Sequence, residues 1–156
     1  MKKLFLLLVF FSFFAFAQMP NIERVWLNEG RAYKGNIGNN KEVLKLKINV
    51  SEQDRKNDQE YFVSGETVVD VNVSKFEGKL KITKYKDGKK ISKVYGEYDF
   101  SEEPNGKHSG NLKGTFIYTF RWDKDGEQIL DPRIEFSGDW KSYDGSLSYK
   151  TELRND

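Results

Sequence analysis

The chain has 156 residues, contains no cysteine and carries a formal net charge of +2. The lack of cysteine excludes disulfides, a thiolate nucleophile, Cys-ligated zinc and a lipid-modified cysteine, while 37% hydrophobic and 32% charged residues are typical of a soluble domain. The excess positive charge comes from Lys2 and Lys3, which leaves residues 18–156 neutral and argues against a nucleic-acid-binding protein, whose affinity depends on basic residues.

The first 17 residues have the pattern of a cleavable signal peptide. Two lysines open it, residues 4–14 form an apolar run with a single serine, and residues 15–17 read Ala-Phe-Ala, the small-x-small site of signal peptidase. The run is shorter than the roughly 20 apolar residues that a membrane span requires. We therefore expect export to a periplasm or to the medium, with residues 18–156 as a single all-β domain that has no membrane span after cleavage.

Hydrophobic alternation with a period of two predicts strands along the rest of the chain. Leu44, Leu46, Ile48 and Val50 alternate with polar residues, which gives one apolar and one solvated face. The same test places about eight strands at residues 31–37, 43–50, 61–73, 76–85, 90–100, 111–122, 128–138 and 146–153. No segment has a helical period of useful length.

Short turns between these segments predict antiparallel neighbours. Residues 38–40, 86–88 and 124–126 combine Asn, Asp and Gly, which accept the positive φ of tight hairpins. Parallel strands would need crossovers of about a dozen residues or more, and the sequence does not provide them. The strands are therefore expected to form a meander.

A repeated motif predicts how the meander closes. The pattern apolar-x-Gly-x-apolar, with Thr once in the last position, is centred on six glycines that share the parity of the apolar residues: Gly35, Gly65, Gly78, Gly96, Gly114 and Gly138. An inward glycine in a strand marks a bend, a bulge or the close approach of another backbone. We predict an all-β fold, an antiparallel meander in a closed or nearly closed β-barrel, with a two-sheet β-sandwich as the alternative.

No catalytic or metal-binding residue is predicted, and no cofactor is expected. His108 has no partner of its kind for zinc, residues 123–127 are interpreted as a hairpin turn rather than a calcium loop, and the adjacent His and Ser of residues 106–110 lie on a polar loop without a nucleophile elbow. Outward lysines at residues 45–47 and 79–86 are interpreted as serving solubility. An enzyme is disfavoured, although a hydrolase that acts on envelope polymers through paired carboxylates stays an alternative.

Aromatic residues in the second half of the domain are the candidate binding site. A barrel of about eight strands is either filled by its own side chains or holds one small ligand. The predicted lining is Tyr98, Phe116, Phe120, Trp122, Phe136 and Trp140. The leading hypothesis is therefore non-enzymatic binding of a small or apolar ligand in the interior, and the alternative is a cell-envelope interaction or structural module with a filled barrel.

Three segments carry a resemblance to a known group. Residues 33–38 (Tyr-Lys-Gly-Asn-Ile-Gly), 95–99 (Tyr-Gly-Glu-Tyr-Asp) and 136–145 (Phe-Ser-Gly-Asp-Trp-Lys-Ser-Tyr-Asp-Gly) resemble segments of small uncharacterised exported bacterial β-proteins. The resemblance implies a lipocalin-like or avidin-like barrel of the calycin type. Because that group has no assigned function, it implies no functional residue.

Overall fold

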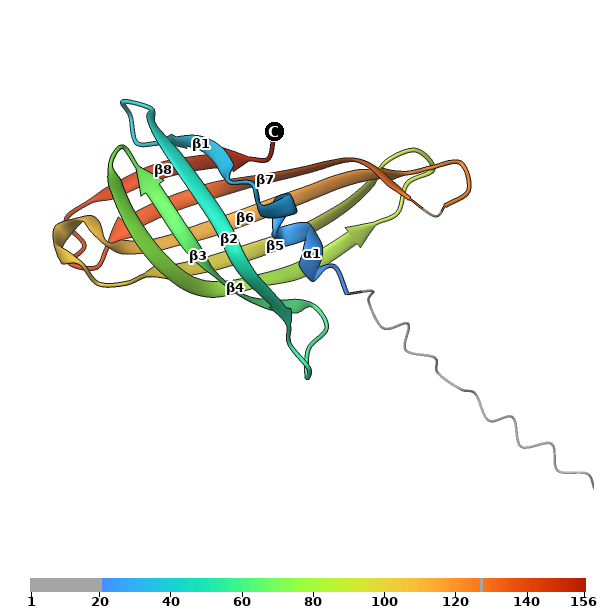
Figure 1. Ribbon diagram of the computed structural model, residues 1–156, viewed down its shortest axis with the longest axis horizontal. Coiled ribbons are helices and arrows are strands. Elements are labelled where there is room, and N and C mark those ends of the chain that lie inside the picture. The colour runs from blue at the N-terminus through green and yellow to red at the C-terminus, as the bar shows by residue number, and fades with distance from the viewer. Residues whose placement is uncertain (1–20, 127) are drawn as a thin grey trace, which may run out of the picture.

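The chain folds into a closed barrel of eight antiparallel strands in chain order, with β8 paired to β1 (Figure 1). The computed structural model describes residues 21–126 and 128–156. The strands are β1 (Tyr33–Ile37), β2 (Glu42–Gln53), β3 (Glu60–Val69), β4 (Asn72–Lys86), β5 (Ser92–Glu102), β6 (Gly110–Trp122), β7 (Ile129–Ser142) and β8 (Ser148–Arg154). The all-β class, the meander and the closed barrel are thereby confirmed, and the two-sheet sandwich is wrong.

The position of one hairpin differs from the sequence-based prediction. The segment expected as a strand over residues 61–73 turns at Asp70 and Val71, so that Val69 pairs with Asn72. Asp70 has a φ of +54°, a conformation that Asp adopts more readily than most side chains. The prediction was wrong here because the turn contains no glycine and the valines on either side continue the alternation.

The six motif glycines all lie at inward positions of their strands, as predicted. Gly114 and Gly138 pair directly across β6 and β7. A Cβ atom on Gly114 would lie 2.1 Å from the carbonyl oxygen of Ser137, and one on Gly138 would lie 2.1 Å from that of Lys113. The neighbouring backbones therefore lie closer together than a Cβ atom at these two positions would allow. This close approach favours the strong coiling that a small closed barrel requires.

The interior is packed with apolar side chains from all eight strands. Its centre is aromatic: the ring of Phe136 lies 5.0 Å from that of Tyr33, 5.4 Å from Tyr98 and 6.0 Å from Phe116, as measured between centroids. Because these rings are in contact, the middle of the barrel is filled by side chains and packed like an ordinary protein core.

A short N-terminal plug covers one end of the barrel. It consists of α1 (Glu23–Trp26) and the 3-10 turn η1 (Asn28–Gly30), where no helix was predicted. Trp26 is fully buried, its ring lies 5.0 Å from Phe116 and 6.3 Å from Tyr118, and its carbonyl accepts a 2.8 Å hydrogen bond from the Tyr33 hydroxyl. The plug thus continues the aromatic core to the barrel end.

Helical structure elsewhere in the described chain is limited to the 3-10 turn η2 (Gly106–His108). The helices of residues 21–126 and 128–156 are too short to cross a membrane.

Candidate functional site

Two hairpins extend beyond the barrel at the plugged end, on the right of Figure 1. The β4–β5 pairing continues to Lys86 and Lys93, and the β6–β7 pairing continues to Trp122 and Ile129. We call the outer parts of these hairpins, residues 84–93 together with residues 121–126 and 128–131, the hairpin fork. The fork exists because these four strands are longer than β1 and β8, which stop at the barrel wall.

Both hairpins change register where they leave the barrel. One residue is inserted on β4 between Ile82 and Lys84, and one on β7 opposite the segment from Thr119 to Arg121. The inserted region of β7 contains Asp131 at a φ of +50°. Such bulges bend a strand and increase its twist, so they re-aim the hairpin tips relative to the barrel wall.

The core-lining face continues onto the fork and becomes exposed there. Paired residues share a face of the sheet: Tyr85 pairs with the buried Val94, and Trp122 pairs with Ile129. Tyr85 is 46% exposed, Trp122 45% and Ile129 37%. The ring of Trp122 stands edge-on to Phe120 at 5.5 Å, so a row of aromatic side chains runs from the core to solvent.

Lysines surround the tip of the first hairpin. The exposed lysines of this segment are Lys84, Lys86, Lys89, Lys90 and Lys93. Within the described part of the chain none of them forms an ion pair, and the single acid of the tip, Asp87, accepts a 2.8 Å hydrogen bond from the Ser92 hydroxyl. The second hairpin has one more acid than base over residues 121–126 and 128–131, because Arg121 pairs with Asp131 and Lys124 stands between Asp123 and Asp125. Positive charge therefore gathers on the β4–β5 tip.

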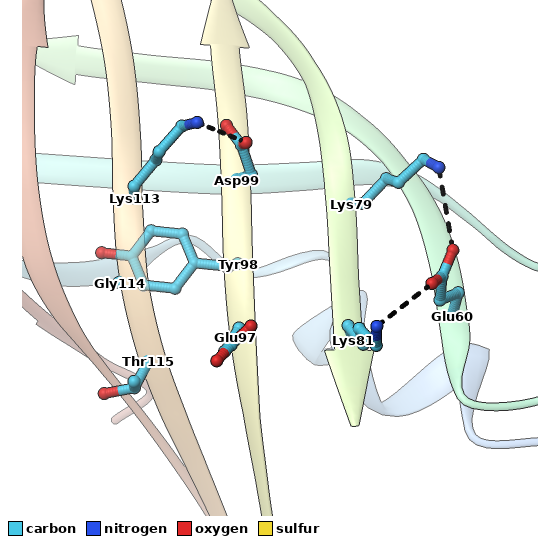
Figure 2. A pocket seen from close by; sticks show the side chains of 9 residues that line it. All are labelled: Glu60, Lys79, Lys81, Glu97, Tyr98, Asp99, Lys113, Gly114 and Thr115. Carbon is cyan, nitrogen blue, oxygen red and sulfur yellow. Dashed lines mark ion pairs between the residues drawn. The ribbon is translucent and has the colours of Figure 1, made fainter. Parts of the chain in front are cut away.

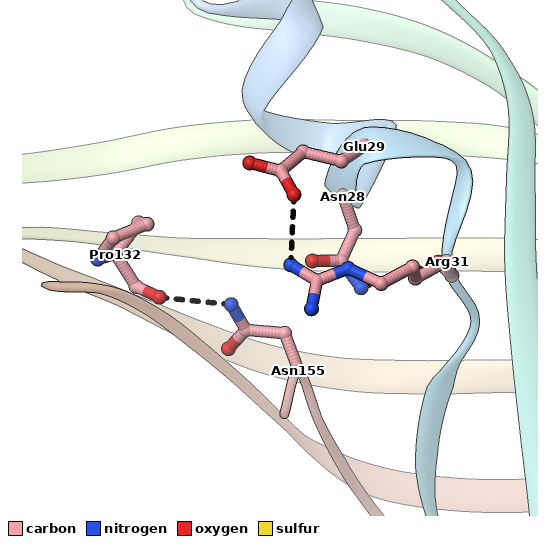
Figure 3. A network of polar contacts seen from close by, with 5 residues as sticks. All are labelled: Asn28, Glu29, Arg31, Pro132 and Asn155. Atoms are coloured by element: carbon pink, nitrogen blue, oxygen red, sulfur yellow. Dashed lines mark hydrogen bonds and ion pairs between the residues drawn. The ribbon is translucent and has the colours of Figure 1, made fainter.

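The C-terminal segment holds the root of the second hairpin in place (Figure 3). The Asn155 side-chain amide donates to the Pro132 carbonyl at 2.9 Å, and its oxygen accepts a 2.6 Å hydrogen bond from the Ile134 backbone N–H. Beside it, Glu29 of the plug forms an ion pair with Arg31 at 3.0 Å. The bend of β7 is thus fixed by contacts from a distant part of the chain, which gives the fork a defined base.

A concave region open to solvent lies on the outer wall across β3 to β6 and has a volume of about 440 Å³ (Figure 2). Lys79 and Lys81 flank Glu60 at 3.7 and 3.8 Å, and Lys113 contacts Asp99 at 2.8 Å. A general acid needs a carboxyl in an apolar setting, whereas these carboxylates lie beside lysines. The region therefore does not favour hydrolase chemistry.

The same wall forms a ladder of alternating charges. Along one row of paired residues, Lys79 faces Asp99, Asp99 faces Lys113, Lys113 faces Asp139 and Asp139 faces Lys150. Opposite charges on neighbouring strands favour the native register, and a slip of one residue would place a charged side chain such as Lys79 opposite a core residue such as Tyr98 or Phe100. We assign this wall a structural role.

The opposite end of the barrel is closed by a buried carboxylate. Glu102 is 5% exposed. It accepts hydrogen bonds from the Thr67 hydroxyl at 2.5 Å, the Trp140 indole N–H at 2.9 Å and the Gly110 backbone N–H at 3.1 Å. Its backbone carbonyl accepts a further hydrogen bond from the Tyr143 hydroxyl. The three hydrogen bonds to the carboxylate link β5 to β3, β6 and β7 at that end.

The six predicted lining residues fall in three places. Tyr98, Phe116 and Phe136 meet in the middle of the core, and burial raises the pKa of Tyr98. Trp140 belongs to the Glu102 cluster at the far end. Phe120 is buried at the base of the fork and Trp122 is on it. The structure therefore does not gather the six into one lining.

Sequence analysis missed the partners of Trp122 on the fork. Tyr85 and Ile129 were both assigned to predicted strands but to no site. The insertion on β4 hid the parity of Tyr85, because its face is defined by the pairing with Val94 rather than by counting from Ile82. The lysines between residues 84 and 93 are evident in the sequence. Their position beyond the end of the barrel follows only from the length of the β4–β5 hairpin.

No family model, curated protein sequence or solved structure matches this chain. Within residues 21–126 and 128–156, no group of three or more His, Asp or Glu side chains is placed to hold a metal ion.

Proposed function

We propose that this protein is an exported, non-enzymatic binding protein whose site is the apolar face of the hairpin fork. The observation that carries the proposal is the exposure of Tyr85, Trp122 and Ile129 on the face that lines the core one step closer to the barrel. We take these side chains together as the binding surface, because contiguous exposed apolar residues mark interaction sites and aromatic side chains are enriched in them.

The proposal moves the expected ligand from the interior of the barrel to its end. Tyr98, Phe116 and Phe136 contact one another and neighbouring rings in the core. A ligand among them would have to displace core side chains, which costs several kcal/mol. Trp122 and its neighbours on the fork offer apolar surface that is already open. The filled barrel then serves as the rigid support of the site.

Export rests on the leader of residues 1–17, with its lysines, apolar run and Ala-Phe-Ala site. The chain contains no cysteine that an oxidising compartment could modify. The proposal therefore places the fork in a periplasm or in the medium, where apolar or amphiphilic molecules and surfaces are its available ligands.

A neutral apolar dye tests the site. The chain from residue 18 onward is titrated with Nile red, and we expect a saturable rise and blue shift of dye emission. Replacing the three apolar residues of the fork by serine (Tyr85→Ser, Trp122→Ser, Ile129→Ser) should weaken dye binding at least tenfold, or about 1.4 kcal/mol.

The control changes exposed aromatics elsewhere on the barrel. Phe62 and Tyr149 are 44% and 38% exposed and lie outside the fork, so the Phe62→Ser, Tyr149→Ser variant should bind the dye like the unchanged protein. Equal losses in the two variants, or no dye binding at all, would refute the proposal.

A further inference from the structure

We propose that the hairpin fork docks onto the surface of an anionic phospholipid membrane. This inference rests on the proposed function and names the partner of the same site. It is carried by three features of the fork: apolar side chains on both faces of the β6–β7 hairpin, lysines around the β4–β5 tip that form no ion pair among the described residues, and a base that Asn155 holds through hydrogen bonds to β7.

The distribution of apolar residues favours a surface over a small ligand. Tyr85, Trp122 and Ile129 lie on the inner face of the fork, whereas Leu130 pairs with Arg121 on the opposite face and is 39% exposed. A cup for a small molecule needs apolar lining on its inner face only. Tips that are apolar on both sides are suited to the boundary between headgroups and acyl chains.

Aromatic residues at the tips support the same partner. Trp122 and Tyr85 each combine an apolar ring with a polar atom, and such side chains concentrate at the interface between membrane and water. Ile91, in the β4–β5 turn, is 48% exposed and adds an aliphatic side chain at the tip. The fork would therefore enter only the outermost part of a bilayer and would not span it.

The lysines provide charge complementarity. Lys84, Lys86, Lys89, Lys90 and Lys93 surround the first tip and form no ion pair within the described residues. Basic residues next to apolar anchors attract anionic lipid headgroups. Asp87 is engaged by Ser92, and the aspartates near Lys124 lie on the other hairpin. Attraction to anionic headgroups therefore rests on the β4–β5 tip, whereas the β6–β7 tip, which has one more acid than base, contributes the apolar ring of Trp122.

The tryptophans provide a built-in reporter of docking. Trp26 is fully buried and Trp140 is 6% exposed, so among the three tryptophans Trp122 alone is open to a change of surroundings. Insertion of the fork should shift tryptophan emission to shorter wavelength. Lipids with bromine in the acyl chain should quench this emission, and a Trp122→Phe variant should dock without either signal.

The test uses the chain from residue 18 onward with vesicles of phosphatidylcholine, with or without about 30% phosphatidylglycerol. We expect cosedimentation with the anionic vesicles at least tenfold stronger than with the neutral ones, weakened by salt because exposed charges are screened. Reversing three fork charges (Lys86→Glu, Lys89→Glu, Lys90→Glu) should reduce anionic-vesicle binding at least tenfold.

The matched control reverses three exposed lysines away from the fork: Lys45, Lys75 and Lys107. This variant has the same net charge as the fork variant and should bind vesicles as the unchanged protein does. Equal weakening in both variants, equal binding to neutral and anionic vesicles, or unshifted Trp122 emission would overturn the inference.

The two proposals fail in different ways. Binding of Nile red at the fork without any binding to anionic vesicles refutes membrane docking and leaves the proposed apolar site intact. Loss of both refutes both. Vesicle binding that survives charge reversal but disappears in the Tyr85→Ser, Trp122→Ser, Ile129→Ser variant refutes the anionic partner, because apolar contact alone would then account for it.

Discussion

The two ends of the barrel are closed by different kinds of contact. At the Glu102 end, polar groups are buried and paired with one another, so that a carboxylate holds four strands together. At the fork end, the plug fills the interior with Trp26 while Tyr85 and Trp122 face solvent. Apolar side chains are exposed at both ends, with Val71 at 82% and Tyr143 at 48% at the Glu102 end. The fork differs because its exposed residues continue the face that lines the core.

Buried donors sharpen this contrast. The Trp26 indole N–H and the Tyr118 hydroxyl lie below the fork and have no hydrogen-bond partner within residues 21–126 and 128–156. Burial raises the pKa of Tyr118 to about 12, so its hydroxyl stays protonated at physiological pH. The Trp140 indole N–H at the other end is paired with Glu102. Hydrogen bonds are present at the plugged end as well, where the Tyr33 hydroxyl donates to the Trp26 carbonyl. The difference is that this end also leaves two buried donors without a partner among the residues that the structure describes, whereas the Trp140 donor is paired.

The largest expected effect is the difference in unfolding free energy between a substitution in the plug and one in the fork. Trp26→Ala should lower the free energy of unfolding by about 3 to 5 kcal/mol, because it empties a fully buried site among Tyr61, Phe116 and Tyr118. Trp122→Ala should lower it by only about 1 kcal/mol, since that ring is 45% exposed and contacts Phe120 alone among the rings of the described residues. Urea unfolding measures both. Similar losses in the two variants would contradict the assignment of Trp26 to the core and Trp122 to the surface.

The next effect tests the hydrogen-bonded end. Glu102→Leu should cost about 3 kcal/mol of unfolding free energy, because it leaves Thr67, Gly110 and Trp140 without their acceptor. Glu102→Gln keeps one acceptor oxygen in nearly the same shape and should cost less than half as much. Denaturant titrations of the two variants give the comparison. If Gln and Leu are equally harmful, the charge rather than the hydrogen bonds holds this end.

Much of the barrel follows from local pattern. A glycine such as Gly114 shares the parity of Leu112 and Phe116 wherever the strand lies, so its inward position could be read before the partner strand was known. Hairpin turns with Asn, Asp and Gly gave the antiparallel order for the same reason. These features depend on a few neighbouring residues and on the period of two.

The features that position the site depend on distant parts of the chain. A four-residue helix is too short to show a period, so the plug and Trp26 were not predicted. Trp122 shares the face of Phe120 as its parity indicates, yet whether that face is core or surface depends on where the other strands end. Glu102 continues the inward parity of Phe100, but its partners come from β3, β6 and β7.

The smallest expected effect concerns pH at the Glu102 end. Asp144 lies in the turn between β7 and β8, and hydrogen bonds from the Ser146 side chain and backbone and from the Ser142 hydroxyl lower its pKa to about 2. A folded-state pKa below the ordinary value of 3.8 means that the carboxylate stabilises the folded protein above about pH 4, and that this contribution disappears as the pH falls toward 2.

Replacement of Asp144 by Asn should therefore lower the melting temperature slightly at neutral pH and leave it unchanged near pH 2. The effect should be small because the carboxylate is exposed to solvent. Melting curves of the two proteins from about pH 2 to pH 7 measure the difference, and Asp125→Asn on the β6–β7 tip provides the same charge change at the fork. A melting-temperature gap between the Asp144→Asn variant and the unchanged protein that is constant across this range would show that the Ser142 and Ser146 hydrogen bonds do not favour the ionised form.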